Sequence, residues 1–493
     1  DTKEADFADL VTESGAAVTP IAPGSFDSQS GELRLTALWK VSSLDAFGTF
    51  GRAEISAMGA LVDYLDLTQK GKLPLLRPPV QERTSGTVQI DAATRRNLEI
   101  THALSGGRDG SLIQAIDRTV TAGGGRLLER RLSSPSRDLA IIQDRHAAIE
   151  ACLNDANAAE DMREALKATP DMERALSRLG LDRGGPRDLT AIRNGLTQAG
   201  RLSFDGPNTL IASLITRLKG FGELCILLND ALIAEPPLLA RDGGFIADGF
   251  DSELDEARTL RDEGRSIIAQ MQTDYAKETG ISALKIKHNN VLGYFIETTA
   301  THAEKMLAMP LSETFIHRQT TANAVRFTTV ALSELETRIL NSGARALEIE
   351  KRLYDNLKRA ILDDAARIGD AARALSEIDL TLAFATLARS ENWNRPEMSD
   401  SRHFNVESGR HPVVERALKS DSGTPFIAND CDLGAEAIWL LTGPNMAGKS
   451  TYLRQNALIA LLAQAGSYVP AKSAEIGLVS QIFSRVGAAD DLA

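Results

Sequence analysis

A glycine-rich run near the end of the sequence has the residue types and spacing of a phosphate-binding loop. It consists of Gly443, Pro444, Asn445, Met446, Ala447, Gly448, Lys449, Ser450 and Thr451. Its glycines let backbone N–H groups turn toward phosphate oxygens, Lys449 can reach the β- and γ-phosphates, and the Ser450 hydroxyl can bind Mg²⁺. The run therefore predicts a nucleoside triphosphate site with Ser450 as a metal ligand. The alternative is a glycine turn that binds nothing.

The residues around the loop predict the elements that must position it. The apolar run at 438–441 predicts a strand, and the Leu- and Ala-rich segment after the loop predicts a long helix. Upstream, Phe426 and Ile427 lie in a short apolar stretch where Phe426 could face a purine, although a core position is the more usual role for a phenylalanine.

The sequence lacks the acidic half of a hydrolytic phosphate-loop site. Such a site needs an acidic residue at a strand end to hold Mg²⁺ and orient water, and no apolar strand ending in Asp-Glu follows Lys449. Asp490 and Asp491 could serve a second metal, but capping a helix is an equally good role for them. We therefore assign no catalytic residue.

Composition indicates an ordinary multidomain globular chain. It has 493 residues, 43% of them hydrophobic and 25% charged, and no run of about 18 apolar residues that could cross a membrane. The three cysteines are far apart and form no C-x-x-C pair, which argues against a disulfide framework and predicts a reducing cytoplasm. The net charge of −12 argues against non-specific coating of nucleic acid by the whole surface.

The first half of the chain predicts a helical scaffold. Residues 17–68 have a mixed pattern typical of the tail of an α/β domain, with a strand end at 17–21, a turn at 26–31 and a helix at 54–67. Prolines at 74–79 indicate a linker. We then expect helices at 92–98 (capped by Asp91), 111–120, 126–132, 139–152, 161–168 and 188–199, with a break at the glycines 123–125.

Two long helices should flank a small β module. Apolar spacing predicts one helix from 252 to Gly280 and another from 331 to about 372, roughly 60 Å long if unbroken. Between them, period-two patterns and polar turns predict hairpins at 284–298 and 314–329. The module could hold a ligand at the end of a lever or simply cap a coiled coil.

The β module is locally basic. Between Lys285 and Arg326 there are five basic and three acidic residues, an excess of +2 in a chain of net charge −12. Such a surface suits sequence-independent contact with a nucleic-acid backbone, and a solvated polar hairpin is the alternative. The candidate nucleic-acid contacts are Lys285, Lys287, Asn289, Asn290, Arg318, Gln319, Asn323 and Arg326.

Taken together, these motifs resemble the MutS family of DNA mismatch-repair proteins. The resemblance is carried by residues 442–451 (TGPNMAGKST), 407–415 (ESGRHPVVE), 425–429 (PFIAN), 466–471 (GSYVPA), 485–493 (RVGAADDLA) and 91–99 (DAATRRNLE). It covers nearly the whole chain. One departure is Ala447, which stands where many members have glycine.

The resemblance implies a multidomain, mainly α protein with α/β parts. Its domains would be the end of a connector domain (1–68), a helical core with lever helices (69–265 and 331–395), a DNA clamp (266–330), and the first part of an ABC-type P-loop ATPase domain (396–493). ATP would place its adenine against Phe426 and Ile427 and its phosphates on 443–451, with Mg²⁺ on Ser450. The clamp would hold the backbone of mismatched double-stranded DNA.

The resemblance also implies partners and alternatives. A second MutS subunit would close a ring around DNA and a MutL-type partner would be recruited, in the bacterial cytoplasm near the nucleoid and away from membranes. The mismatch-reading domain, the signature loop and the Mg²⁺-binding acidic pair are expected beyond this chain, so we expect a piece cut at both ends that does not itself turn over ATP. The alternative is a paralogue that clamps DNA structurally in recombination without reading mismatches. A nuclease-bearing paralogue is disfavoured by the two hairpins.

Overall fold

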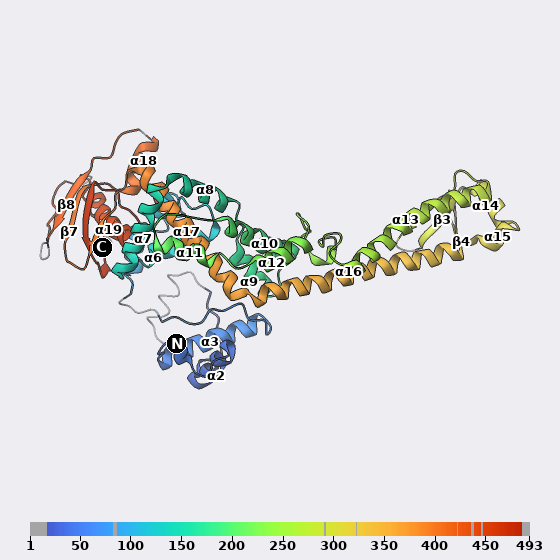
Figure 1. Cartoon of the computed structure of the whole chain (residues 1–493), viewed down its shortest axis with the longest axis horizontal. Helices are drawn as coiled ribbons and strands as arrows, with labels where there is room; N and C mark the ends of the chain where they lie inside the picture. Colours follow the sequence, from blue (N-terminus) through green and yellow to red (C-terminus); the bar gives the residue numbers. More distant parts are fainter. Residues whose placement is uncertain are drawn as a thin grey trace, which may run out of the picture. The chain divides into compact units, whose positions relative to one another are not determined.

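The computed structural model describes residues 17–81, 86–289, 292–321, 323–421, 423–434, 438–444 and 447–485 (Figure 1). The chain divides into two units. The first contains residues up to 184, 194–222 and 364 onward, and the second contains 185–193 and 223–363. Within the described ranges, no helix has the length and apolar character that a membrane span requires.

The N-terminal segment is helical. It consists of η1 (Pro23–Phe26), α2 (Ser28–Trp39), η2 (Leu44–Ala46) and α3 (Arg52–Thr68). The helix predicted at 54–67 is confirmed. The predicted strand end at 17–21 is wrong, because these residues form no strand. The predicted turn at 26–31 is also wrong, because Asp27 accepts a hydrogen bond from the Ser30 N–H at 2.7 Å and so starts α2. The described residues of 17–68 contain no strand, and their assignment to the tail of an α/β domain stays a prediction.

A bundle of helices forms the body of the first unit, with α17 (Ala365–Glu391) at its centre (Figure 1). Aspartate, serine, threonine or asparagine side chains cap most of the other helices at their N-termini, and Asp91 does so through the Thr94 N–H at 2.6 Å, as predicted. The other helices described in this part of the chain are α4 (Ala92–Asn97), α5 (Leu112–Ile116), α6 (Ala122–Ser133), α7 (Leu139–Asn154), α8 (Ala156–Lys167), α9 (Met172–Gly180), α10 (Pro186–Arg201) and α11 (Thr209–Arg217). Helix α10 is divided between the two units after residue 193.

The glycines at 123–125 do not break a helix, which corrects the prediction. Helix α6 runs through them because Gly124 lies directly against the carboxylate of Asp379 on α17. That carboxylate is fully buried and accepts hydrogen bonds from the Val120 and Thr121 N–H groups (3.0 and 2.8 Å) and from the Thr121 hydroxyl (2.6 Å). The absence of a side chain at Gly124 therefore permits α6 and α17 to approach each other closely.

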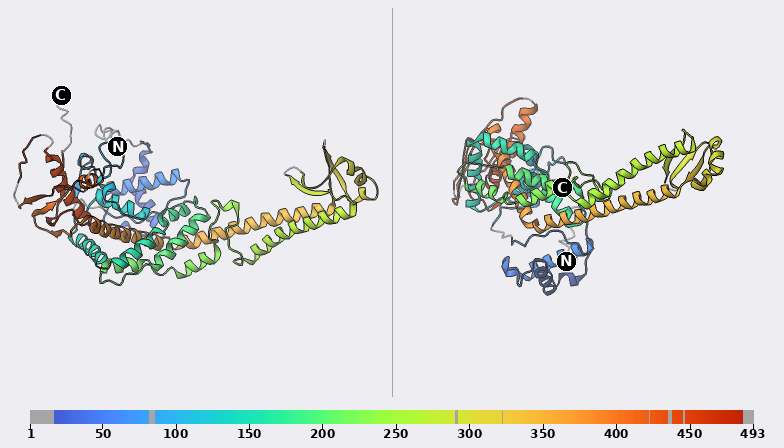
Figure 2. Two further views of the ribbon diagram at one scale, coloured as in Figure 1. Left: turned by 90° about the horizontal axis from the view of Figure 1, so that it is seen from above. Right: turned by 45° about the vertical axis from the view of Figure 1, so that its right-hand side comes forward.

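The second unit contains the predicted β module. In chain order it consists of α12 (Gly222–Ala231), η3 (Ala240–Asp242), α13 (Ser252–Thr279), β2 (Lys285–Asn289), β3 (Gly293–Thr298), α14 (Ala300–Leu307), α15 (Leu311–Thr314), β4 (Ile316–Thr320), β5 (Val325–Thr328) and α16 (Val330–Asp363). Both hairpins are confirmed, and they form one antiparallel sheet in the order β2-β3-β5-β4. The module lies at the end of the α13 and α16 pair (Figure 2).

The β module has a core of its own. Tyr275, Phe315 and Phe327 are buried in it, and the Tyr275 hydroxyl is hydrogen-bonded to the Thr329 hydroxyl at 2.8 Å. The single helix predicted from 331 to 372 is instead two helices. Helix α16 ends at Asp363 and α17 begins at Ala365, because the backbone of Asp364 leaves helical geometry.

The C-terminal part of the first unit contains a mixed sheet in the order β6-β9-β7-β8. Strands β6 (Glu397–Ser399) and β9 (Ser473–Gly477) are parallel, whereas β7 (Phe404–Gly409) is antiparallel to both β9 and β8 (Asn429–Leu433). The helices here are α18 (Pro412–Asp421) and α19 (Lys449–Ala465), and a separate parallel pair joins β1 (Gln89–Ile90) to β10 (Gln481–Ile482).

The contact between Gly124 and Asp379 can be tested by substitution. Gly124→Ala should lower the free energy of unfolding by about 1–3 kcal/mol, because the added methyl carbon would lie 2.1 Å from the Asp379 Oδ2 atom. Gly200→Ala in α10 is the control, since no atom lies within 4 Å of its added carbon. This substitution should raise the free energy of unfolding by about 0.5–1 kcal/mol. Chemical denaturation measures both, and a Gly124→Ala protein as stable as the parent would contradict the close approach.

Candidate functional site

The predicted phosphate loop leads into the N-terminus of α19. Gly448 occupies the N-cap position in the left-handed region (φ 85°), and no side chain caps the helix. The first backbone N–H groups of a helix have no intrahelical acceptor, and the helix dipole makes this end electropositive. Lys449, Ser450 and Thr451 form the first turn, which therefore offers N–H groups, an ammonium and hydroxyls to an anion.

Lys449 is oriented along the loop. Its Nζ donates hydrogen bonds to the carbonyl oxygens of Gly443 and Pro444, the latter at 2.8 Å. Among the described residues no carboxylate pairs with it. An ammonium held only by neutral acceptors keeps its charge available, so these residues fit the triphosphate that the sequence predicted.

Other parts of the predicted nucleotide site are placed less completely. Residues 438–441 form no strand, and Ile438 and Leu440 are exposed, so that prediction is wrong here. A strand needs a neighbour, and the described sheet offers residues 438–441 no partner. Ile427 is also exposed and Phe426 is half-buried just before β8. Asn445, Met446, Asp490 and Asp491 lie outside the described residues.

The described residues of this site do not form a preformed metal-binding cluster. Within the ranges that the structure describes, no three His, Cys, Asp or Glu residues cluster closely enough to hold a metal ion. Ser450 is exposed at the start of α19 and would contribute one oxygen. Magnesium keeps several waters and takes phosphate oxygens as ligands, so one protein hydroxyl fits a metal brought with a nucleotide.

Helix α19 is fixed to the helical bundle along its length. The buried Gln464 exchanges hydrogen bonds with the Ser136 backbone, and its side-chain oxygen accepts from the Val479 N–H at 2.8 Å. Nearer the loop, Arg454 forms an ion pair with Glu99 at 3.1 Å. The helix that bears the loop therefore packs against α6 and α7 and is bonded to Glu99 just after α4, and the sequence did not reveal these contacts.

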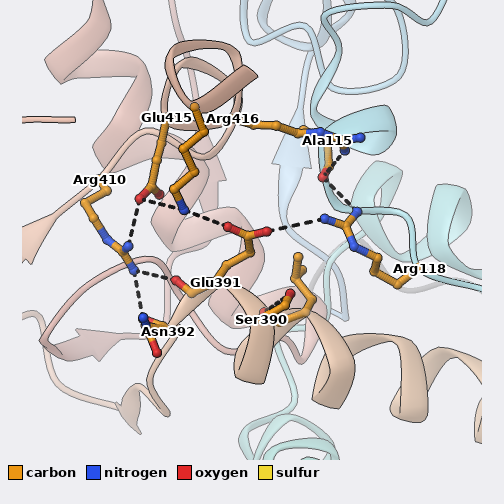
Figure 3. Close-up of polar contacts among 10 residues, drawn as sticks. Ala115, Arg118, Ser390, Glu391, Asn392, Arg410, Glu415 and Arg416 are labelled. Carbon is orange, nitrogen blue, oxygen red and sulfur yellow. Dashed lines mark hydrogen bonds and ion pairs between the residues drawn. The ribbon is translucent and has the colours of Figure 1, made fainter. Parts of the chain in front are cut away.

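A network of charged side chains joins the end of α17 to α18 (Figure 3). Glu391 pairs with Arg118 at 3.6 Å and with Lys419 at 2.8 Å, and Lys419 also pairs with Glu415 at 3.3 Å. Arg410 pairs with Glu415 at 2.9 Å and donates to the Glu391 and Asn392 carbonyl oxygens. Sequence reasoning did not assign this network, although Arg410 and Glu415 both lie in the quoted stretch 407–415.

One residue from each of the four strands of the β module lies in a row across the sheet, and three of these four residues are predicted DNA contacts. Lys285 on β2 is opposite Glu297 on β3, Glu297 is opposite Arg326 on β5, and Arg326 is opposite Gln319 on β4. Because directly opposed residues share a sheet face, these side chains lie on one face, while Ile296, Phe327 and Val325 fill the core on the other.

Glu297 compensates part of the positive charge on this face. It accepts from Lys287 at 2.7 Å and from Arg326 at 3.1 Å, and these bonds, the Lys287 bond above all, hold the pKa of Glu297 below its ordinary value. Arg326 also lies over the Phe295 ring at 4.6 Å and donates to Gln319 at 2.9 Å. The cations are therefore ordered by hydrogen bonds rather than freely mobile.

The remaining candidates occupy the turns and the edge strand. Asn289 stabilises its own hairpin by accepting from the Leu292 N–H at 2.7 Å. Arg318 is exposed at an irregularity in the pairing of β4 with β5, and Asn323 is exposed in the second turn. Asn290 lies outside the described residues.

A glycine-capped helix that begins with Lys-Ser-Thr, backed by a sheet and joined to a long helical scaffold, is the architecture of a P-loop protein with an attached helical domain. Comparison with protein families agrees with this class. Residues 93–385 match MutS domain III and residues 439–493 match MutS domain V. The first match covers more than half of the 493 residues, and the chain belongs to the MutS family.

Known relatives are similar along the whole chain. The DNA mismatch repair protein MutS of Cereibacter sphaeroides is 67% identical over 492 residues, which cover 98% of this chain and 56% of that protein. The MutS proteins of Ruegeria pomeroyi (67% identical; 97% and 55% covered) and Paracoccus denitrificans (64%; 99% and 56%) are similar to it in the same way. The chain spans about half the length of these curated relatives.

His411 precedes α18, and its Nδ1 accepts a hydrogen bond from the Val414 N–H at 3.3 Å. Burial, with a smaller contribution from the charge of Arg454, lowers the pKa of His411 to about 4. The unfolded chain therefore binds the proton first as the pH falls from about 6.5, so this residue's contribution to stability is lost between about pH 6.5 and 4.

His411→Asn keeps a hydrogen-bond acceptor at this position but removes the titrating group. The free energy of unfolding of the parent should fall relative to that of the variant by up to about 3 kcal/mol between pH 6.5 and pH 4. Denaturant titrations at several pH values measure the difference, in which the other titrating groups cancel. Parallel pH profiles for the two proteins would contradict the lowered pKa.

Proposed function

We propose that this chain forms the ATP-binding and DNA-clamping parts of a DNA mismatch repair protein. The proposal is carried by one observation: a chain that matches MutS domains III and V contains both an anion-binding helix start and a basic β module. The relatives described above are named DNA mismatch repair proteins, which supports repair rather than a structural clamp in recombination.

The nucleotide would be ATP, bound with Mg²⁺ at the start of α19. Lys449 and the first-turn N–H groups would hold the phosphates, and Ser450 would supply a hydroxyl to the metal. Phe426 and Ile427 would cover the base, and the exposure of Ile427 makes its side chain accessible to a ligand. Bound Mg²⁺ supplies charge neutralisation at the phosphates.

Double-stranded DNA would lie against the ordered polar face of the β module. Backbone phosphates, which carry no sequence information, would be contacted by Lys285, Arg318 and Asn323. They would also be contacted by Lys287 and Arg326, the two cations that Glu297 orders. These contacts would not read a mismatch, which would require other residues. A second MutS subunit would close a ring around the DNA, and a MutL-type protein would be recruited to the resulting complex.

The two sites would communicate through consecutive helices. Helix α16 begins directly after β5, α17 follows α16 after a single residue, and Glu391 at the end of α17 contacts α18 through Lys419. Because linked binding equilibria are reciprocal, DNA must alter nucleotide affinity as much as nucleotide alters DNA affinity.

The decisive experiment measures nucleotide affinity of the intact protein with a mismatched duplex, with a fully paired duplex and without DNA. We expect the mismatched duplex to change the affinity by about 5- to 150-fold, the usual range of allosteric coupling. Lys449→Ala should weaken triphosphate binding by about 10- to 100-fold, the value of charge-assisted hydrogen bonds, while DNA binding without nucleotide persists.

Lys472→Ala is the matched control, because Lys472 is an exposed lysine on the same part of the chain that pairs only with Glu407 among the described residues. It should leave triphosphate affinity unchanged. Equal nucleotide affinities with and without the mismatched duplex would refute the coupling, and a Lys449→Ala protein that binds triphosphate normally would refute the site.

The charge balance on the β module gives a separate prediction. Glu297→Gln should raise affinity for a fully paired duplex by about two- to fivefold, because Lys287 and Arg326 lose their competing carboxylate. The dependence of log K on log[salt] should steepen by about one. Fluorescence anisotropy at several salt concentrations measures both quantities.

Glu304→Gln provides the control, because Glu304 is an exposed acid of the same module on α14 and forms no ion pair in the described structure. It removes the same charge without releasing a cation. If both variants changed DNA affinity equally, the effect would be one of net charge and the proposed contact face would be wrong.

A further inference from the structure

An arginine-lined cavity lies in the helical bundle of the first unit, away from the phosphate loop. Its volume is about 540 Å³, within the range of about 300–1,000 Å³ that small-ligand sites occupy. Residues of α6, α7, α9, α11 and α17 line it, together with Arg77 from the segment before β1. Six arginines line this arginine cavity: Arg77, Arg126, Arg130, Arg145, Arg217 and Arg373.

Three of these arginines are neutralised by neighbouring carboxylates. Arg126 pairs with Asp171 and Glu173 at 2.8 and 3.0 Å, and both Arg217 and Arg373 bond to Asp370 at 2.7 and 3.1 Å. Their guanidinium groups are positioned by these bonds and need no ligand.

The other three, Arg77, Arg130 and Arg145, have no hydrogen-bonded carboxylate among the described residues. The cavity also contains Asp144 and Glu377, but Glu377 is bonded to the buried Arg131, whose side chain is only 6% exposed. Among the cavity's charged side chains that lack a hydrogen-bonded partner of opposite charge, three are therefore cations and one, Asp144, is an anion. The cavity keeps an excess of positive charge although the chain as a whole carries −12.

The guanidinium groups here repel one another. Burial, reinforced by the charge of Arg145, lowers the pKa of Arg131 to about 9, and its Nε atom is buried without a partner. Burial also lowers the pKa of Arg145; the charge of Glu377 opposes this shift, and the charge of Arg130 adds to it. Glu377 is already bonded to Arg131, so one carboxylate serves several converging guanidinium groups, and a bound anion would relieve their repulsion.

Arg145 is held in place by packing. A carbon added to Gly466 would lie 2.5 Å from the Arg145 Cδ atom, so the aliphatic stem of Arg145 rests directly on this glycine. Gly466 caps the C-terminus of α19, whose 17 residues span about 25 Å. The phosphate loop is at the opposite end of that helix, so the cavity is a distinct site.

We propose that the arginine cavity binds a small oligophosphate anion, with Arg77, Arg130 and Arg145 as its ligands. Arginine forks match phosphate oxygens in pairs, and several guanidinium groups around one enclosed volume favour a ligand with several phosphate groups. The cavity, at about 540 Å³, is far smaller than a DNA duplex and so favours a small molecule, whereas a duplex could meet only its exposed rim.

The test is calorimetric titration of the intact protein with inorganic tripolyphosphate. Lys449→Ala is introduced throughout, so that the phosphate loop does not contribute. In that background, Arg77→Ser combined with Arg130→Ser should raise the Kd at least about tenfold, since two charge-assisted contacts are lost. Arg145→Met, which keeps the stem on Gly466, should also weaken binding.

Arg241→Ser is the matched control, because Arg241 is an arginine with 81% of its side chain exposed and only a 4.0 Å ion pair to Asp242. It should change the Kd less than about twofold. Equal thermal unfolding midpoints establish that the variants are folded; Arg77 and Arg130 are exposed, so we expect no loss of stability.

Two results would overturn the proposal. One is the absence of tripolyphosphate binding in the Lys449→Ala background, and the other is binding that the arginine variants and Arg241→Ser weaken equally. A short duplex titrated in parallel tests the remaining source of phosphate: loss of duplex binding in the arginine variants without any tripolyphosphate binding would assign the arginines to DNA and refute a small-anion site.

Discussion

The arrangement of the first unit depends on a buried carboxylate on its central helix. Asp379 has no exposed surface, and burial raises its pKa, yet three hydrogen bonds from Val120 and Thr121 hold the side chain against the start of α6. A buried polar group is tolerated only when its hydrogen bonds are made, so this contact specifies how α6 and α17 meet. Gly124 of α6 leaves room for that carboxylate, and Gly123 leaves room for Ser376 of α17.

The same central helix leads at its C-terminus to the charged network with α18. Glu391 lies in its last turn and bonds to Lys419 of α18, while Arg410 bonds to the carbonyl oxygens that α17 leaves at its C-terminus. The network is partly shielded from water, with the Glu415 side chain only 9% exposed. Partly buried ion pairs that share members are stronger and more directional than single surface pairs, which suits a junction between two domains.

Charge is handled differently in the β module and in the arginine cavity. On the β module, Glu297 orders two cations and reduces their net charge, which leaves an extended face suited to many weak backbone contacts. In the cavity, three guanidinium groups are left without hydrogen-bonded carboxylates around a volume of about 540 Å³. An extended surface whose positive charge is partly neutralised favours a long polyanion. A concave surface with a larger excess of positive charge favours a compact anion.

The sequence by itself determined the local elements and the family. Apolar spacing and turn residues identified α13, both hairpins and the caps at Asp91 and Gly280, since these depend on neighbouring residues. The run at 443–451 predicted the helix that begins at Lys449. Tertiary structure decided whatever requires a distant partner. The apolar run at 438–441 has no described strand to pair with. The glycines at 123–125 lie inside a helix, where Gly124 is closely approached by Asp379 of α17. The arginines of the cavity come from segments up to about 300 residues apart. Sequence spacing records chain neighbours, whereas strand pairing, buried contacts and charge clusters depend on which segments meet in space.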